Sequence, residues 1–373
     1  MFRRSIKNIK YKHTKFVNID GRDLLNLSSN DYLGISTNKS LIDEFQAKFG
    51  NEYNFSSASA RLLSGTEEIY SKLEVLLAQL FNKEKALIYN TGYQCNLGVI
   101  SALNTKGNVV FSDKLNHASI IDGMRLSEGD FYRFKHLDYS HLEVLLQKHR
   151  ENYKNAIIVS ESIFSMDGDY ADIRKLIELK NKYNCKLMID KAHAFLAFGD
   201  VFGRGLYAEY VDDIDIITAT FGKALGSFGA FVVTSKDIVE ALINTSRSFI
   251  FSTAIPPINI AWTYWLLAEK SDFLISQRQK LFQNTLAVHR LLKELEIDTV
   301  SLTHKIPFVF KQTELTEKVC EQLQALGYFV LPIRPPTVPE GSSRIRLSLT
   351  AETTVDDVRL LLEKVSDELK LVK

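Results

Sequence analysis

Between residues 67 and 235, short apolar runs rich in β-formers alternate with segments of helical spacing, and this alternation is the strongest constraint on the fold. Strands are predicted at ALIYN (86–90), NVVFSD (108–113), NAIIVSES (155–162), KLMID (186–190), DIITAT (215–220) and GAFVVTS (229–235). Apolar strands separated by helices are typical of an α/β fold with a mostly parallel sheet covered on both faces. Such sheets bind ligands beyond the carboxyl ends of their strands, so we expect the functional residues there.

The intervening segments predict helices at 67–81, 91–103, 117–127 and 171–183. Pro256-Pro257 ends the alternation, and a long helical stretch follows at about 258–295. A strand–helix–strand–strand–helix pattern between 305 and 365 then predicts a smaller α+β domain. The expected organisation is an N-terminal arm (1–36), a large domain (37–255) and a C-terminal small domain with its long linking helix (256–373).

Composition excludes several classes of protein. A net charge of +1 over 373 residues gives no field that points to nucleic acid or membrane partners. Cys95, Cys185 and Cys320 lie far apart, which argues against a zinc site or disulfide framework and fits a reducing cytoplasm. No signal peptide or membrane-spanning run is visible, so we expect a cytoplasmic protein without metal. The basic cluster at residues 3–15 fits a solvated arm better than a patch for an anionic substrate or carrier.

The stretch LMIDKAHAFLAFGD places Asp190, Lys191 and His193 at the end of a buried strand. A carboxylate there needs a positive or hydrogen-bonding partner, and a helix cap or an internal salt bridge is the alternative to a ligand site. Neighbours in a strand point to opposite faces. Lys191 should therefore diverge from Asp190 and is not expected to be the reactive amine.

A second lysine, Lys223 in TATFGKALGSFGAF, lies on a glycine-bounded turn after an apolar strand. A nucleotide P-loop would need Gly and Ser or Thr where Ile217 and Ala224 stand, so that interpretation fails. A lysine on a tight turn suits a Schiff-base amine, because the small neighbours allow a cofactor to approach closely. The alternative is a surface lysine in a hairpin-like turn.

In NTGYQCNLG a strand ends and a helix begins at Gly92 and Tyr93, which makes an anion site suited to phosphate. Tyr93 could equally belong to the core, and His117, just past the next strand, could be a buried hydrogen-bonded histidine. Together these residues predict pyridoxal phosphate, with its aldehyde on Lys223 and its ring nitrogen facing Asp190. A buried carboxylate would keep that nitrogen protonated.

The ordered motifs identify a family resemblance over essentially the whole chain, carried by LNLSSNDYLG, SARLLSGT, NTGYQCN, SDKLNHASIIDG, ESIFSMDGD, IDKAHAF, TFGKALG and IRPPTVPEGSSRIRLSLTA. The chain resembles the α-oxoamine synthases, which are pyridoxal-phosphate enzymes of fold type I. The resemblance implies a large domain with a mostly parallel seven-stranded sheet, a smaller C-terminal domain, and a homodimer with shared active sites.

For the reacting centre, the resemblance implies that Lys223 forms the Schiff base and then moves the Cα proton. It also implies that Asp190 holds the pyridine nitrogen, that His193 holds the phenolic oxygen, and that His117 stacks on the ring. The further cofactor contacts that it implies are Gly92, Tyr93, Ser165 and Thr220.

For the substrates, the resemblance implies that Asn30 and Arg346 hold the amino-acid carboxylate, which an arginine fork matches bidentately. Arg4 and Thr337 match positions near the acyl substrate. RPPTVP around Thr337 is most similar to the branch that condenses L-alanine with a pimeloyl thioester in biotin biosynthesis, releasing CO2. The chain departs from the family at Lys191, where an acid is usual; a cation leaning toward Asp190 would compete for that carboxylate.

Other functions stay open at this point. One is another α-oxoamine synthase such as a glycine C-acetyltransferase, and a second is an aminotransferase on the same fold. A third is a non-catalytic partner subunit, against which the retained Lys223, Asp190, His193 and His117 argue. The acyl carrier could be coenzyme A or an acyl carrier protein.

Overall fold

The structure is a computed structural model that describes residues 6–13, 15–200, 204–205 and 208–370, with Arg4 outside the described residues. The described chain forms two compact units. Unit 1 contains the residues up to Asp43, the short segment Ser165–Asp169, and the residues from Ser276 onward. Unit 2 contains Glu44–Phe164 and Tyr170–Ile275.

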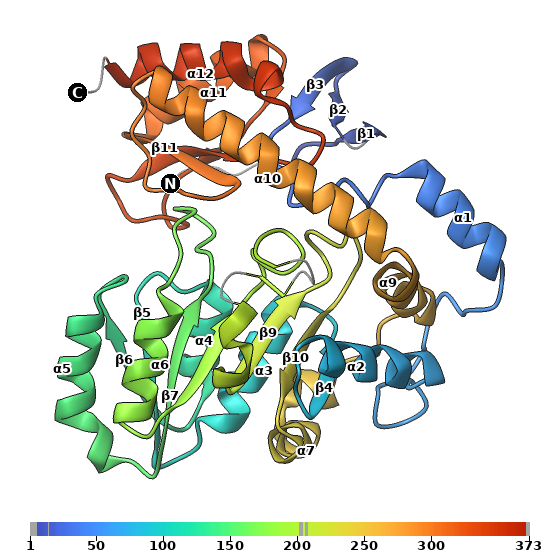
Figure 1. Ribbon diagram of the computed structural model, residues 1–373, viewed down its shortest axis with the longest axis vertical. Coiled ribbons are helices and arrows are strands. Elements are labelled where there is room, and N and C mark those ends of the chain that lie inside the picture. Colours follow the sequence, from blue (N-terminus) through green and yellow to red (C-terminus); the bar gives the residue numbers. More distant parts are fainter. Residues whose placement is uncertain (1–5, 14, 201–203, 206–207, 371–373) are drawn as a thin grey trace. The chain divides into compact units, whose positions relative to one another are not determined.

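Unit 2 is built on a seven-stranded sheet in the order β4-β10-β9-β8-β7-β5-β6 (Figure 1). Only β10 runs antiparallel to its neighbours, so the sheet is mostly parallel, as predicted. The strands in sheet order are β4 (Lys85–Tyr89), β10 (Ala230–Thr234), β9 (Ile216–Thr220), β8 (Lys186–Asp190), β7 (Asn155–Glu161), β5 (Asn108–Asp113) and β6 (Asp130–Phe134).

Helices cover both faces of this sheet. Apolar residues of six strands form one core cluster with α3 (Gly92–Leu103), α4 (Ala118–Leu126), α7 (Lys236–Thr245) and α8 (Arg247–Ile250). Other helices pack on β4, β5 and β8, namely α2 (Glu68–Leu80), α5 (Tyr139–His149) and α6 (Ile173–Lys182). Figure 1 shows α5 and α6 on the face opposite α3 and α4. Burial on both faces explains why the strands read as continuous apolar runs.

Unit 1 contains two small sheets, in the orders β1-β2-β3-β12 and β11-β14-β13. Their strands are β1 (Lys10–His13), β2 (Phe16–Ile19), β3 (Arg22–Asn26), β11 (Lys305–Lys311), β12 (Tyr328–Phe329), β13 (Pro332–Ile333) and β14 (Ser343–Ser348). The helices of its C-terminal part are α11 (Thr313–Ala325) and α12 (Val355–Lys370). Two helices each continue from one unit into the other, α1 (Lys39–Phe49) and α10 (Ser271–Glu294).

The division differs from the expected domain boundaries at two places. The N-terminal segment is not a separate arm, because β3 pairs in parallel with β12 and so joins the C-terminal part of the chain. The helical stretch at 258–295 is two helices, and the first, α9 (Pro257–Glu269), packs on α2 within unit 2. None of the described helices is both long and apolar enough to cross a bilayer.

Hydrogen bonds connect the segment Ser165–Asp169 to the rest of unit 1. The carbonyl oxygen of Gly168 accepts hydrogen bonds from Thr303 Oγ1 at 2.9 Å and Ser301 Oγ at 3.3 Å. Gly168 has a φ of +69°, and a Cβ at this residue would lie 1.9 Å from the carbonyl oxygen of Lys305. Both the backbone conformation and the close approach therefore require glycine here.

We expect Gly168→Ala to lower the free energy of unfolding by about 3 kcal/mol, because it combines left-handed backbone strain with a backbone clash. Gly21→Ala is the matched control, since Gly21 has a φ of +82° with nothing within 4 Å of its added Cβ. It should cost about 1 kcal/mol from strain alone. Urea unfolding measures both, and equal losses would contradict the close-approach argument.

Candidate active site

Asp190 is the last residue of β8, and its carboxylate is buried at the carboxyl edge of the unit 2 sheet. Its Oδ1 accepts a hydrogen bond from the Ala192 N–H at 2.8 Å, and its Oδ2 accepts one from Asn96 Nδ2 at 2.6 Å. Asn96 Oδ1 in turn accepts from Thr218 Oγ1 at 2.8 Å. Neither bond to Asp190 is an ion pair, and a carboxylate can accept further donors.

A second carboxyl group lies beside the first. Glu161 ends β7 and pairs in register with Asp190, and its Oε1 accepts a hydrogen bond from the His117 N–H at 2.6 Å. Burial, followed by the charge of Asp190, raises the pKa of Glu161 well above its usual range. Burial and the neighbouring negative charge both favour the protonated form of Glu161.

His117 stands at the N-cap of α4. Its Nδ1 accepts from the Ser119 N–H at 3.2 Å and lies 2.8 Å from Ser119 Oγ. Ser119 Oγ in turn accepts a hydrogen bond from Asn96 Nδ2 at 3.1 Å. Burial lowers the pKa of His117, so the ring is neutral at pH 7 and can act as this acceptor. His117, Ser119, Asn96 and Asp190 thus form one hydrogen-bonded network.

Lys223 lies on the turn between β9 and β10 and is partly buried. Its Nζ is 2.8 Å from Nε2 of the buried His193. The turn is closed by hydrogen bonds from the Gly226 N–H to the Lys223 carbonyl at 2.9 Å and from the Phe221 N–H to the Gly229 carbonyl at 2.9 Å. This contact with a histidine distinguishes Lys223 from a lysine that only faces solvent.

The start of α3 lies next to this turn. Thr91 caps the helix by accepting from the Gln94 N–H at 3.1 Å, and an added Cβ at Gly92 would lie 3.6 Å from Thr220 Cβ. Thr220 Oγ1 accepts from the Gly222 N–H at 3.1 Å. Tyr93 is 42% exposed and hydrogen-bonds Asp122, so it is not a core residue.

Lys191 does not share the partners of Asp190. Its side chain is fully buried, and its Nζ donates to the carbonyl oxygen of Arg204 at 3.1 Å. Burial lowers the pKa of Lys191 to about 8. The two adjacent side chains reach different groups, in keeping with the strand alternation that separates neighbouring residues.

The other predicted site residues lie in unit 1. Arg346 Nη1 donates to the Ser165 carbonyl at 2.8 Å and to Ser165 Oγ at 3.0 Å, whereas its Nε is buried without a hydrogen-bond partner among the described residues. Asn30 Oδ1 accepts from Lys305 Nζ at 2.7 Å. Thr337 lies in an exposed turn between β13 and β14.

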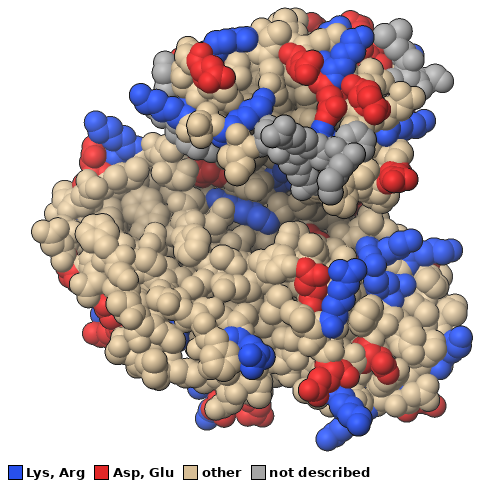
Figure 2. All heavy atoms as spheres, turned by 180° about the vertical axis from the view of Figure 1, so that it is seen from behind, with Lys and Arg blue, Asp and Glu red and all other residues tan. Residues whose placement is uncertain are grey.

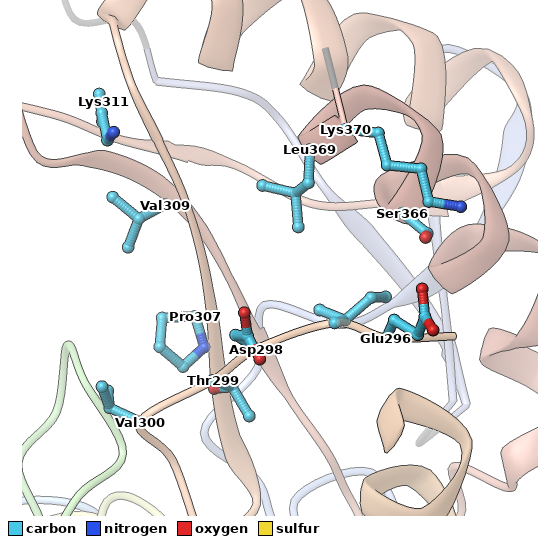
Figure 3. A pocket seen from close by; sticks show the side chains of 11 residues that line it. Glu296, Asp298, Thr299, Val300, Pro307, Val309, Lys311, Ser366, Leu369 and Lys370 are labelled. Carbon is cyan, nitrogen blue, oxygen red and sulfur yellow. The ribbon is translucent and has the colours of Figure 1, made fainter. Parts of the chain in front are cut away.

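A cavity of about 430 Å³ in unit 1 lies along the edge of β11 and contains none of the predicted site residues (Figure 3). Its lining comes from the chain after α10, from β11 and from the end of α12, and includes Val300, Pro307, Val309 and Leu369. Within the described part of the chain, no group of three His, Cys, Asp or Glu residues is placed to hold a metal ion. The candidate site therefore rests on the hydrogen-bonded groups and not on this cavity.

Comparison with known proteins decides the family. The sequence pattern described as "Aminotransferase class I and II" matches residues 22–365. The chain belongs to this aminotransferase class I and II family. The resemblance to α-oxoamine synthases is confirmed by relatives from Glaesserella parasuis, 43% identical over 96% of this chain and 95% of the relative, and Haemophilus influenzae, 43% identical over 95% and 94%. Both bear the name "Putative 8-amino-7-oxononanoate synthase".

Solved structures of the family confirm the fold type I architecture. Serine palmitoyltransferase from S. paucimobilis, with a bound PLP–myriocin aldimine, has a TM-score of 0.87 and 27% identity, covering 98% of this chain and 93% of that one. The 8-amino-7-oxononanoate synthase from Francisella tularensis has a TM-score of 0.76 and 26% identity, covering 93% and 98%.

Besides Ser119, two groups near Asp190 were not predicted from the sequence, namely Asn96 and Glu161. Each has a sequence signal in retrospect: Asn96 is a buried amide on the otherwise largely apolar helix GYQCNLGVISAL, and Glu161 is an acid within the apolar strand NAIIVSES. A polar residue in a run buried on both faces requires a partner. Asn96 finds its partners in Asp190, Ser119 and Thr218. Glu161 accepts from the His117 N–H.

The raised pKa of Glu161 gives a testable pH dependence. A carboxyl whose folded pKa exceeds its unfolded value stabilises the protein fully below the unfolded pKa, and this stability is lost as pH rises through the folded pKa. Glu161→Gln keeps the oxygen that accepts from His117 but cannot ionise. We therefore expect its stability, relative to the wild type, to increase as pH rises above the ordinary glutamate pKa of about 4.3 in urea unfolding.

Glu128→Gln is the control, because Glu128 is exposed. Its stability relative to the wild type should change little over the same range. A Glu161→Gln profile parallel to that of the wild type would contradict the raised pKa of Glu161.

Proposed function

We propose that this protein catalyses a pyridoxal-phosphate-dependent condensation of L-alanine with a pimeloyl thioester to give 8-amino-7-oxononanoate, CO2 and the free carrier thiol. The observation that carries the proposal is the pairing of Lys223 Nζ with His193, in the unit that also holds the buried Asp190. The carboxylate of Asp190 accepts hydrogen bonds from the uncharged Asn96 amide and Ala192 N–H. The names of the 43% identical relatives and the RPPTVP motif support the choice of substrates.

The residues present fit this cofactor. Asp190 can accept a further donor such as a pyridinium N–H. Lys223 offers an amine in the same unit, and its charge, like that of Asp190, acts on Glu161. The capped start of α3 offers free N–H groups for a phosphate, and Gly92 keeps side-chain bulk away from them. When bound, pyridoxal phosphate supplies an electron-accepting ring at the amino-acid Cα.

The chain's own residues divide the work. Lys223 would carry the cofactor aldehyde and then remove and return a proton at the alanine Cα, with His193 holding its amine. Asp190, kept in place by Asn96, would hold the ring nitrogen in its protonated state. His117, neutral and fixed by Ser119, would lie against the ring as a flat, uncharged surface.

For the substrate carboxylate, the buried Nε of Arg346 and the amide of Asn30 are the groups we assign. In the overall change, a bond forms between the alanine Cα and the acyl carbon. The thioester C–S bond and the bond from Cα to the carboxylate both break. The carboxylate leaves as CO2, and the carrier leaves as a thiol.

The decisive experiment compares steady-state rates of the purified holoenzyme with alanine plus pimeloyl groups on coenzyme A or on acyl carrier protein, and with glycine plus acetyl-CoA. We expect turnover and CO2 release only with alanine and a pimeloyl thioester. Preference for glycine and acetyl-CoA would assign a glycine C-acetyltransferase instead.

Lys223→Ala should lose the visible absorbance of the bound cofactor, and its turnover should fall by several orders of magnitude.

We further propose a homodimer. Unit 2 exposes large apolar side chains on two segments that lie together, since the Ala254 N–H donates to the Ser59 carbonyl at 2.9 Å: Phe55 (75% exposed), Leu63 (81%) and Phe251 (70%). Figure 2 shows a face of the protein on which a broad area bears almost no charged side chain. Contiguous exposed apolar surface marks association sites.

We expect Leu63→Lys combined with Phe251→Lys to convert a dimer into a monomer in analytical ultracentrifugation, because two buried charges would oppose the interface. Val75→Lys combined with Leu360→Lys is the control, since these exposed residues belong to α2 and α12. A wild-type monomer would contradict the proposal.

A further inference from the structure

A buried lysine that the proposed chemistry does not use lies in unit 1. Lys305 is fully buried at the start of β11. Its Nζ donates to Asn30 Oδ1 and to Ser348 Oγ, both at 2.7 Å, and lies 4.4 Å from the centre of the Tyr32 ring. Burying an ammonium group costs several kcal/mol unless its surroundings compensate, so this position calls for a physical reason.

The contacts of Lys305 fix the orientation of the Asn30 side chain. An ammonium group has only donors, so the amide atom that faces it must be the oxygen. Tyr32 OH donates to the same oxygen at 3.2 Å, and burial raises the pKa of Tyr32, which keeps the phenol protonated as a donor. With Oδ1 occupied by two donors, the amide NH2 of Asn30 is directed away from them as a hydrogen-bond donor.

The second cation of this region lies on the same face of the small sheet. In the β11–β14 pairing, Lys305 is opposite Ser348 and Pro307 is opposite Arg346, so the side chains of Lys305 and Arg346 project to one side. The charge of Arg346 acts on Tyr32, whose ring also contacts Lys305. Arg346 Nε is buried without a partner among the described residues. This face therefore gathers two cations and a donor amide.

We propose that Lys305 is a positioning residue for recognition of the amino-acid carboxylate: it holds Asn30 with its NH2 outward and adds positive charge beside Arg346. The proposal rests on the assignment of Asn30 and Arg346 to that carboxylate. It predicts a role in binding the amino acid rather than in the proton transfers at Cα.

The test uses Lys305→Met, which keeps an unbranched four-atom side chain in place of the lysine stem and removes the ammonium group. Lys311→Met is the matched control, because Lys311 is on the same strand but exposed at its far end. Holoenzyme is titrated with L-alanine and with ethylamine, which is alanine without its carboxylate, while the visible absorbance of the cofactor is followed. Steady-state kinetics give KM for each substrate and kcat.

We expect Lys305→Met to weaken alanine binding and raise its KM about tenfold, with ethylamine binding, the KM of the acyl substrate and kcat changed less than threefold. Lys311→Met should match the wild type. Unchanged alanine binding, or equal weakening of alanine and ethylamine, would overturn the proposal. Because the titration needs no acyl substrate, failure of the wild type to use a pimeloyl thioester would contradict only the proposed function.

A second variant covers a failure of Lys305→Met to fold. Tyr32→Phe keeps the ring and removes the other donor to Asn30 Oδ1. It should weaken alanine binding about threefold and leave ethylamine binding unchanged. If Tyr32→Phe binds alanine in preference to ethylamine as strongly as the wild type does, the proposed positioning of Asn30 is contradicted.

Discussion

The buried carboxylate of Asp190 is the constraint on which the rest of unit 2 depends. A charge at the end of a strand buried on both faces is tolerated only where donors are supplied. Here the donors come from the turn after β8 and from Asn96 on α3, which fixes this helix against the strand. The same amide reaches Thr218 and Ser119, so one side chain ties β9 and α4 to the carboxylate. The donors that satisfy this one buried charge thus also hold α3, α4 and β9 at the same edge of the sheet.

Much of this arrangement is visible in the sequence. The strand KLMID occupies Lys186–Asp190, as predicted, and the turn carrying Lys223 follows an apolar strand. These features are encoded locally, in runs of β-forming residues and in glycines. The divergence of Asp190 and Lys191 also follows from a local rule, the alternation of side chains along a strand.

What the sequence does not reveal is non-local. The pairing of β3 with β12 joins Leu25 to Tyr328, and no local pattern announces such a partner. The break of the helical stretch at Lys270 lies between two segments that each have ordinary helical composition. Glu161 looks like one acid in an apolar strand, and its pKa is raised by burial and then by Asp190, its neighbour on the next strand. These properties arise only when distant segments are packed together.

Unit 1 takes its residues from three separate stretches of the chain, and the middle one is only the five residues Ser165–Asp169. Those residues carry the partners of Arg344 and Arg346 and the glycine that packs against Lys305. Consequently, a single cut in the sequence cannot separate unit 1 from unit 2, either for a domain exchange or for expression of the C-terminal part. An exchange of unit 1 between relatives would have to carry this short segment together with both ends of the chain.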